Sequence, residues 1–380
     1  MRAVVGVVPG QRNPQEAITE AFAAAVGADA SATRSVLDRI HANAGVETRH
    51  LVLPLERYAH LGSFREANDE FIRHGVDLGA RALGEALDRA GLRADDLDLL
   101  VTCTVTGLAV PSLDARIAAR LRLRDDVRRL PIVGLGCVAG AAGVARIRDH
   151  LTGHPAHVAA LVCVELCSLT LQRDDLSAAN LVASGLFGDG AAAVLMTGAD
   201  VGGAGDAART ALVRPDNRTN PPPPATHTCS SAGPTLRVLD SRSRLYPDTE
   251  RAMGWDVGDS GLRIVLGVEV PELVAAHVGA DVDGFLATHG LRREDIAFWV
   301  AHPGGPKVLE ALQVALGLDR EALGVTWRSL AAIGNLSSAS VLHVLADTLA
   351  TRPPAPGSLG MMLAMGPGFC LEMVLLEAAA

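Results

Sequence analysis

An internal repeat constrains the fold of this 380-residue chain more than any other feature of its sequence. The segment at residues 91–103, GLRADDLDLLVTC, aligns with the segment at residues 290–302, GLRREDIAFWVAH, at a constant offset of 199 residues (302 − 103). An amphipathic helix follows each segment. Then comes LGCVAGAAGVARIRDHL in the first half and IGNLSSASVLHVLADTL in the second. A duplicated strand–helix unit that folds on itself relates its two copies by a pseudo-two-fold axis, so we expect two similar halves.

Short apolar runs that alternate with amphipathic stretches predict an α/β fold. The runs at 97–105 and 158–166 are almost wholly apolar, which is typical of strands buried on both faces, and the run at 130–133 looks buried too. A long amphipathic helix should end at Gly91, a residue that favours a left-handed C-cap. The other expected elements are strands at 3–8 and within 186–197, and helices near 14–26, 66–90 and 112–121.

The chain is expected to divide into three parts. Residues 198–236 are rich in Gly, Ala, Pro, Ser and Thr, contain a four-proline run and lack periodicity, which is typical of a flexible surface insertion or linker. This insertion separates a first half at 1–197 from a second half at 237–380. Each half is predicted to close with a glycine hairpin before a strand, at 187–190 and at 365–368.

Composition argues against several classes of function. A net charge of −9 and an aromatic content of 3% do not suit a nucleic-acid-binding surface. No apolar run reaches the ~18 residues of a membrane span. The six cysteines have no CxxC spacing, so we expect neither a zinc site nor a disulfide framework, and the eleven histidines other than His302 show no metal spacing. We therefore expect a cytoplasmic protein with no metal and no nucleic-acid or membrane partner.

Cys137 lies where an apolar run and a glycine turn lead into a helix of small residues. Unpaired backbone N–H groups and the positive end of the helix dipole favour a thiolate there, so Cys137 is a candidate nucleophile. The alternative is a buried structural cysteine, with glycines for close helix packing. The pattern Gly134-x-Gly136-x-x-Ala139 also matches a dinucleotide-binding fingerprint superficially.

The repeat supplies partners for Cys137. Asn335 aligns with it at an offset of 198 residues (335 − 137), so the pseudo-two-fold axis should place the two residues opposite one another. His302 follows the repeated strand, and sites in α/β sheets form at the carboxyl ends of strands. His302 is alternatively a core histidine with satisfied hydrogen bonds. Asp189 is more consistent with a turn residue, whose carboxylate accepts hydrogen bonds from backbone N–H groups, than with an acid catalyst.

Five motifs, in this order, resemble the type III polyketide synthases, the chalcone synthase-like family with the thiolase fold, and its bacterial members in particular. The resemblance covers the chain apart from 198–236, and it implies a duplicated αβαβα layered core and a homodimer. The motifs are GLGCVAG around Cys137, LFGDGAAA at 186–193, HPGGPK at 302–307, GNLSSAS at 334–340 and MGPG at 365–368.

The resemblance implies a role for each of three residues. Cys137 would accept an acyl group from a coenzyme A (CoA) thioester and carry the growing chain, and His302 would hold it as thiolate in an imidazolium–thiolate pair. His302 and the Asn335 amide would donate hydrogen bonds to the thioester oxygen as malonyl-CoA loses CO2 and an enolate forms. Malonyl-CoA and acyl-CoA would be substrates, with no permanently bound cofactor.

Further residues match the family's substrate passage. Phe187 aligns with one of two gatekeepers between the CoA tunnel and the cavity, and Ile264 stands where plant members have a second, aromatic gatekeeper. Val110 matches a loop that reaches into the neighbouring subunit's cavity. The other cavity matches are Cys167, Thr170, Trp255, Ser337, Gly366 and Pro367, and the CoA-binding candidates are Gly304, Gly305, Lys307 and Arg49.

The gatekeeper position occupied by Ile264 also suggests a substrate. An aliphatic wall suits an alkyl chain, because each buried methylene contributes about 0.8 kcal/mol. We therefore expect a medium- or long-chain fatty acyl starter and an alkyl-pyrone or alkylresorcinol product, unless the bulk of Trp255 shortens the cavity. The alternative enzyme is a ketoacyl synthase III, which performs one condensation and uses acyl-carrier protein. The alternative from another class is a non-catalytic thiolase-fold partner that only shapes another subunit's cavity.

Overall fold

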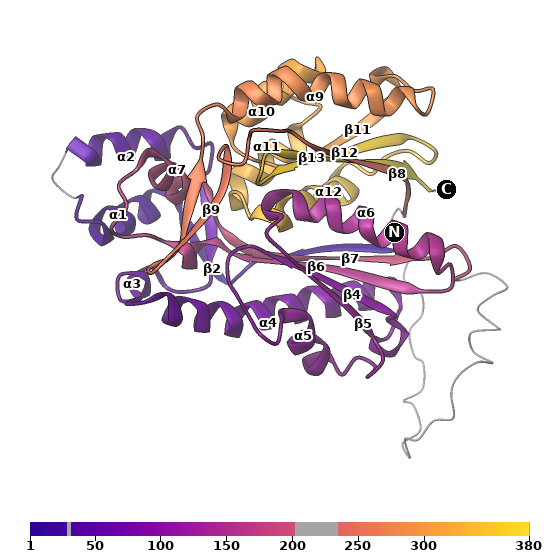
Figure 1. The fold of residues 1–380 in the computed structure, drawn as a ribbon, viewed down its shortest axis with the longest axis horizontal. Helices are drawn as coiled ribbons and strands as arrows, with labels where there is room; N and C mark the ends of the chain where they lie inside the picture. The colour runs from indigo at the N-terminus through magenta and orange to yellow at the C-terminus, as the bar shows by residue number, and fades with distance from the viewer. Residues whose placement is uncertain (29–31, 202–234, 380) are drawn as a thin grey trace.

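The computed structural model describes residues 1–28, 32–201 and 235–379, and it confirms the predicted α/β class. Two sheets are stacked, with helices on both outer faces and the helices α6 (Ala139–Gly153) and α12 (Ser340–Thr351) between them (Figure 1). Three large groups of buried apolar side chains fill the spaces between these layers. The expected αβαβα order is therefore present.

The first half of the chain forms a five-stranded sheet in the order β1-β7-β6-β4-β5. Every residue of β6 is buried, because α4 and α5 cover one face of the sheet and α6 covers the other. The helix α4 ends at Gly91, whose φ of +64° confirms the predicted C-cap. The bounds are β1 (Ala3–Val7), β4 (Leu99–Thr104), β5 (Arg128–Val133), β6 (Val158–Leu166), β7 (Asp189–Thr197), α4 (Phe64–Ala90) and α5 (Leu113–Leu121).

The second half forms a four-stranded sheet in the order β11-β12-β13-β8. The helices α9 and α10 cover its outer face, and α12 packs on its inner face. Alternate residues of β12 therefore enter different groups of buried side chains, Met361 and Leu363 on the outer side and Met362 and Ala364 on the inner side. The bounds are β8 (Leu236–Leu245), β11 (Ile296–Ala301), β12 (Leu359–Gly366), β13 (Cys370–Ala378), α9 (Val270–Ala287) and α10 (Pro306–Leu316).

The predicted repeat is confirmed in atomic detail at the start of β4 and of β11. In the first half the Asp96 carboxylate accepts a hydrogen bond from the Arg93 N–H, and in the second half Asp295 accepts one from the Arg292 N–H. Both distances are 2.8 Å, and both turns are short 3-10 helices, at Ala94–Asp96 and Arg293–Asp295.

The remaining elements lie around the site end of the molecule. One of them, α7, separates β6 from β7, so residues 187–190 do not form the predicted hairpin, whereas residues 365–368 do form one between β12 and β13. The remaining bounds are α1 (Gln15–Ala25), α2 (Ala32–Ala42), α3 (Leu55–Tyr58), α7 (Ala178–Leu186), α11 (Gly324–Ile333), β2 (Gln11–Pro14), β3 (Thr48–Leu51), β9 (Met253–Gly258) and β10 (Gly261–Leu266).

The expectation that 130–133 is buried is wrong. This run belongs to β5, which pairs only with β4 and forms an edge of the first sheet. Leu130 is 43% exposed and Val133 is 59% exposed. The apolar pattern of an edge strand is the same as that of a central strand, because the strands that pair with it come from elsewhere in the chain. The sequence of the strand therefore does not show that one of its sides is open.

Most of the predicted insertion at 198–236 lies outside the described residues, and the division into three parts stays a prediction. Among the described helices, none combines the length and the apolar character needed to cross a membrane.

The helices α6 and α12 approach so closely that glycine is required between them. An added Cβ at Gly140 would lie 2.3 Å from the carbonyl oxygen of Ser338 and 2.7 Å from Val341. The small residues of α6 therefore allow the first turns of α6 and α12 to come into contact.

This packing predicts opposite effects for two glycine-to-alanine changes. Gly140→Ala should lower the free energy of unfolding by about 1–3 kcal/mol, because a backbone oxygen cannot move aside. Gly84→Ala, in α4 with no atom within 4 Å of its added Cβ, should raise it by about 0.5–1 kcal/mol. Urea denaturation measures both values. Equal effects would contradict the packing argument.

Candidate active site

Cys137 lies in a 3-10 turn, Gly136–Val138, that runs directly into α6, as predicted. Gly136 has a φ of +54°, and an added Cβ there would lie 2.7 Å from the ring of Pro367. Only glycine therefore fits the turn that presents the thiol. Pro367 and Gly366, predicted cavity positions, pack against this turn from the β12–β13 hairpin; an added Cβ at Gly366 would lie 2.7 Å from a backbone oxygen of the turn.

The second half brings Asn335 and Ser337 to the same place. Asn335 follows α11, and Ser337 begins the 3-10 turn Ser337–Ala339 that leads into α12. The Ser337 hydroxyl lies 3.7 Å from the Cys137 sulfur. The start of α6 in the first half and the start of α12 in the second half thus converge, as the repeat predicted.

The orientation of the Asn335 amide is fixed by its neighbours. Its Oδ1 accepts a hydrogen bond from the Ser337 backbone N–H at 2.8 Å and one from the Ser340 hydroxyl at 3.4 Å. Only the oxygen of the amide can accept a hydrogen bond from an N–H, so the oxygen is the atom that faces Ser337. The Nδ2 group therefore remains available as a donor. The Asn335 side chain also interacts with Cys137 and acts to lower the pKa of its thiol. This arrangement suits the predicted oxyanion donor.

His302 comes directly after β11, at the carboxyl end of the strand, and it is 2% exposed. Its backbone N–H donates to the Leu363 carbonyl at 2.8 Å, which anchors the residue to β12. Neither ring nitrogen has a hydrogen-bond partner within the described part of the chain. Leaving buried polar atoms unpaired is unfavourable, so the alternative of a satisfied core histidine does not describe this residue.

The imidazolium–thiolate pair is not the form that this geometry favours. Burial raises the pKa of Cys137 to about 12, although the hydroxyl of Ser337, a backbone N–H and Asn335 act in the opposite direction. Burial also lowers the pKa of His302 to about 3. Both shifts favour neutral groups, because a low-dielectric environment disfavours each charge and no hydrogen bond joins the two side chains.

Sequence reasoning missed Glu165, a fully buried carboxylate that joins the two halves at the site. Its Oε1 accepts a hydrogen bond from the Ser338 hydroxyl at 2.5 Å. Its Oε2 accepts from the Thr106 hydroxyl at 3.0 Å and from the Val105 N–H at 3.1 Å. Burial raises its pKa, and its charge acts to raise that of Cys137. A single glutamate within the apolar run 158–166 was the available signal.

Phe187 is held beside Asn335 by backbone hydrogen bonds. The Gly188 N–H donates to the Asn335 carbonyl, and the Asn335 N–H donates to the Leu186 carbonyl, both at 2.9 Å. The gatekeeper and the amide are therefore placed by one short bridge between the halves.

Phe187 also lines a cavity together with most of the predicted gatekeeper and cavity residues. Ile264 and Trp255 are direct register partners across the β9–β10 hairpin, so both side chains reach the cavity from one wall. The wall is therefore partly aromatic. Cys167 and Thr170, which were also predicted to line the cavity, do line it.

Asp189 behaves as the predicted N–H acceptor. Its carboxylate binds the backbone N–H groups of Val52 and Ser168, both at 2.8 Å, and the Ser168 hydroxyl.

Arg49 does not lie at a surface tunnel mouth. It is 2% exposed, and its Nη1 donates to the Phe187 carbonyl at 2.7 Å while its Nε donates to Gln15 at 3.1 Å. Arg49 therefore positions the gatekeeper. Arg49 also lines the cavity beside Phe187, and its role in CoA binding stays a prediction.

The other residues predicted to bind CoA, Gly304, Gly305 and Lys307, connect His302 to α10. Lys307 is exposed on the first turn of this helix. Val110 is 96% exposed on the connection that follows β4 and does not line this chain's own cavity.

The expectation that the other histidines lack metal spacing is wrong for three of them. His150, His154 and His157 have ring nitrogens within 4.8 Å of one another at the far end of α6. The three residues are only four and three positions apart (154 − 150 and 157 − 154), so the spacing was visible in the sequence, and the turn at Pro155 brings His157 back towards the other two.

Comparisons with known proteins agree with this geometry. Residues 1–201 match the family "Chalcone and stilbene synthases, N-terminal domain" and residues 238–380 match the corresponding C-terminal domain. A 1,3,6,8-tetrahydroxynaphthalene synthase of Streptomyces peucetius subsp. caesius is 50% identical over 99% of this chain and 92% of its own length. A 3,5-dihydroxyphenylacetyl-CoA synthase of Streptomyces toyocaensis is 34% identical over 89% of this chain and 81% of its own length. The crystal structure of the Streptomyces coelicolor 1,3,6,8-tetrahydroxynaphthalene synthase, a bacterial type III polyketide synthase, superposes with a TM-score of 0.86 at 27% identity, covering 99% of this chain and 98% of the other.

The raised pKa of Cys137 predicts how its reactivity depends on pH. Only the thiolate reacts, and the whole range from pH 6 to 9 lies below a pKa of about 12. The rate of alkylation by iodoacetamide should therefore rise about tenfold per pH unit without a plateau, as followed by peptide mapping. The same slope is expected in His302→Gln. A plateau below pH 7 that His302→Gln abolishes would establish the ion pair instead.

Proposed function

The chain belongs to the chalcone and stilbene synthase family and is a type III polyketide synthase, and from this we propose that Cys137, His302 and Asn335 condense malonyl-CoA units iteratively without a carrier protein. The observation that carries the assignment is the convergence of the Cys137 thiol with the oriented Asn335 amide of the other half. The His302 imidazole, at the carboxyl end of β11, has ring nitrogens without partners among the described residues. Acyl transfer by a thiol needs these three groups.

Loading begins with the neutral thiol. As the Cys137 sulfur attacks the carbonyl of an acyl-CoA, its proton passes to His302, so that the thiolate, which desolvation disfavours, does not accumulate. The carbon–sulfur bond to CoA then breaks, and the CoA sulfur receives the proton. His302 can accept it because its ring nitrogens are free of other partners.

Extension uses the donors of the second half. Malonyl-CoA loses CO2 by breaking the bond to its carboxylate, and the electron pair forms an enolate. Asn335 Nδ2 donates a hydrogen bond to the enolate oxygen, and so does the His302 ring through an N–H. The enolate carbon attacks the Cys137 thioester, forms a carbon–carbon bond and breaks the carbon–sulfur bond. The extended chain leaves as a CoA thioester and the Cys137 thiolate takes up a proton from solvent. Transfer of the chain back to Cys137 repeats the loading step. An amide suits this role because it does not titrate.

We propose that malonyl-CoA supplies the starter as well as the extenders. The relative that is 50% identical is named for a naphthalene with only hydroxyl substituents, and five two-carbon units account for its ten carbons. Trp255 supports a short product, because its indole lies across from Ile264 on the same cavity wall.

The fatty acyl starter is the second candidate. Aliphatic side chains line the cavity on the side of the N-terminal helices, including Ile18, Leu51 and Leu55. These would pack against an alkyl chain and favour an alkyl-pyrone or alkylresorcinol product.

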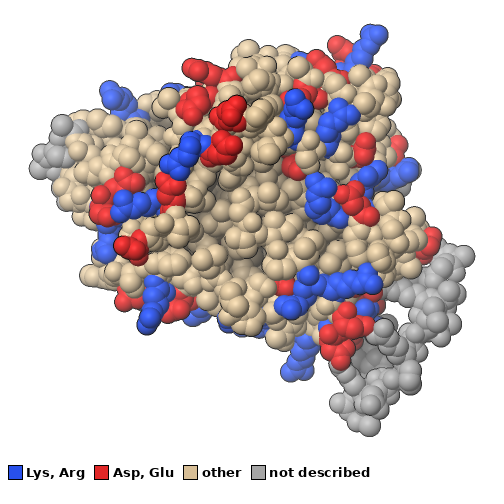
Figure 2. All heavy atoms as spheres, in the orientation of Figure 1, with Lys and Arg blue, Asp and Glu red and all other residues tan. Residues whose placement is uncertain are grey.

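We also propose a homodimer that forms through β5. This strand is an unpaired sheet edge, and the exposed apolar residues Leu108, Val110, Leu130, Val133 and Leu135 lie on it or on the connections next to it. Figure 2, in the orientation of Figure 1, shows that the middle of the viewed side is hollowed and carries few charged side chains, although β5 itself begins with the exposed Arg128 and Arg129. An open apolar edge favours pairing with a second strand.

Lys307 remains our candidate for a phosphate of CoA, because its exposed cation stands at the start of α10 beyond the Gly304–Gly305 connection. It would act on substrate binding only.

Substitution of the triad should separate the steps. Cys137→Ala should abolish polyketide formation but retain decarboxylation of malonyl-CoA, whereas Asn335→Ala should slow decarboxylation about 100- to 1,000-fold. His302→Gln should impair condensation more than loading. CO2 release and acyl-enzyme mass spectrometry measure these steps, with the exposed Asn43→Ala as a control. Near-normal decarboxylation by Asn335→Ala would contradict the oxyanion role.

The starter is identified by mass spectrometry of products. Malonyl-CoA alone should yield a pentaketide at a rate that acetyl-CoA and fatty acyl-CoA thioesters do not increase. A marked preference for a fatty acyl-CoA would replace this assignment with the alkyl product. A single condensation that requires acyl-carrier protein would indicate ketoacyl synthase III chemistry, and absence of turnover would favour the non-catalytic partner.

If the chain dimerises through β5, a charge placed on this strand should weaken the dimer but leave the fold of the monomer intact. Leu130→Asp should give a folded monomer by sedimentation, because association would bury an unpaired carboxylate. Val314→Asp, at a residue 79% exposed on α10, should remain dimeric. A Leu130→Asp dimer would place the interface elsewhere.

A further inference from the structure

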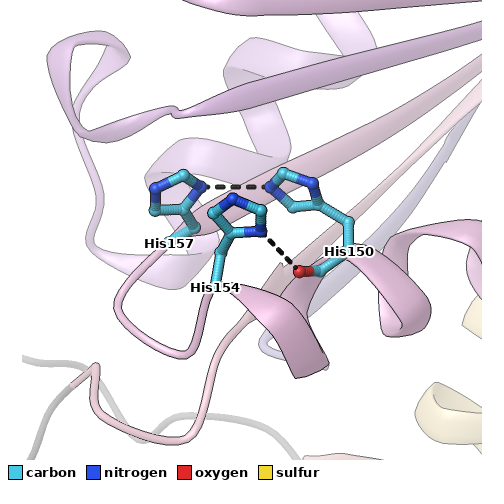
Figure 3. A group of neighbouring side chains, drawn as sticks. All are labelled: His150, His154 and His157. Atoms are coloured by element: carbon cyan, nitrogen blue, oxygen red, sulfur yellow. Dashed lines mark hydrogen bonds between the residues drawn. The ribbon is translucent and has the colours of Figure 1, made fainter.

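Three histidines meet at the end of α6 opposite to Cys137 (Figure 3). His150 lies in the last turn of the helix, His154 directly follows it, and His157 directly precedes β6. All three are half-buried, and one ring nitrogen of each lies within 4.8 Å of those of the others.

The spacing of the nitrogens is close to what one metal ion requires. His150 Nε2 and His157 Nδ1 are 3.1 Å apart. With zinc–nitrogen bonds of about 2.0–2.1 Å, two nitrogens on a tetrahedral ion lie about 3.3 Å apart. The ring of His154 lies beside both, with centroid distances of 4.4 Å and 4.6 Å (Figure 3). The His154 ring is stacked on that of His150, and it would have to turn out of this stack to complete a three-nitrogen set.

The hydrogen bonds of His154 fix the nitrogen that it presents. Its Nδ1 lies 3.1 Å from the His150 carbonyl oxygen, which can only accept, so Nδ1 carries the hydrogen. Its Nε2 therefore carries a lone pair, and the Arg128 guanidinium, which can only donate, lies 3.0 Å from it. A backbone carbonyl that orients a ligating imidazole is the usual second partner of a metal-bound histidine.

The surrounding charges bear on binding in both directions. A histidine binds a metal ion through the lone pair of a neutral ring. Arg124 and Arg128 oppose a cation, and Asp98 attracts one. Arg128 is exposed and free to turn away from His154.

We propose that His150, His154 and His157 bind one Zn²⁺ ion through Nε2, Nε2 and Nδ1, with water in the fourth position. Three neutral imidazoles suit a borderline-soft divalent ion and not Mg²⁺ or Ca²⁺. The ion closes the connection between α6 and β6. It stabilises the fold and takes no part in catalysis, because the 15 residues of α6 separate it from Cys137 by about 20 Å.

Calorimetric titration of the untagged chain with ZnCl2 tests the site, using Cys137→Ala to remove the active-site thiol. One ion should bind per chain. His157→Ala and the milder His157→Gln should each weaken binding at least about tenfold, as losses around a metal site do. Arg128→Ala should tighten it, because a competing cation is removed. His60→Ala, at an exposed histidine outside the cluster, should bind as the parent does.

Thermal unfolding gives an independent measurement. Zn²⁺ should raise the Tm of the parent and of His60→Ala but not that of His157→Gln. The proposal is overturned by the absence of one-to-one binding or by equal affinity in the parent and in both His157 variants. Unchanged affinity in Arg128→Ala would overturn the assignment of His154 Nε2 as a ligand.

Discussion

The buried hydrogen bond between Glu165 and Ser338 is the contact on which the site depends. It joins the end of β6, in the first half, to the 3-10 turn before α12, in the second. A buried carboxylate is unfavourable unless its oxygens are satisfied, and here both oxygens accept hydrogen bonds. This bond therefore helps to hold the two halves in the position in which the starts of α6 and α12 meet.

Two polar side chains at the site keep atoms that can still bind a substrate. Asn335 has its oxygen bound and its Nδ2 left as a donor, while both nitrogens of His302 lack partners in the described part of the chain. Unpaired polar groups lower stability, and a bound thioester would satisfy them. The site is thus incomplete without its substrate, which accounts for neutral groups before loading and for charge that develops only during the reaction.

The cavity is controlled from the same framework. Arg49 donates to the carbonyl of Phe187, and the backbone on either side of this residue is bonded to Asn335. A substitution of Phe187 that changes the substrate preference is therefore expected to move the Asn335 amide as well. The opposite wall is formed by Trp255 and Ile264 on the separate β9–β10 hairpin.

The sequence by itself determined the repeat, the strand–helix units, the family and the convergence of Cys137 with Asn335. These follow from local periodicity and from a duplication, both of which are visible in linear order. Only the tertiary structure decided that β5 is an exposed edge, that Arg49 is buried, that Glu165 joins the halves and that three histidines meet beyond α6. Each of these depends on contacts between residues far apart in the chain, or on a turn whose direction spacing does not encode. Burial also shifts the pKa of both groups, upward for the Cys137 thiol and downward for the His302 imidazole, and so disfavours the ion pair that the family resemblance implied.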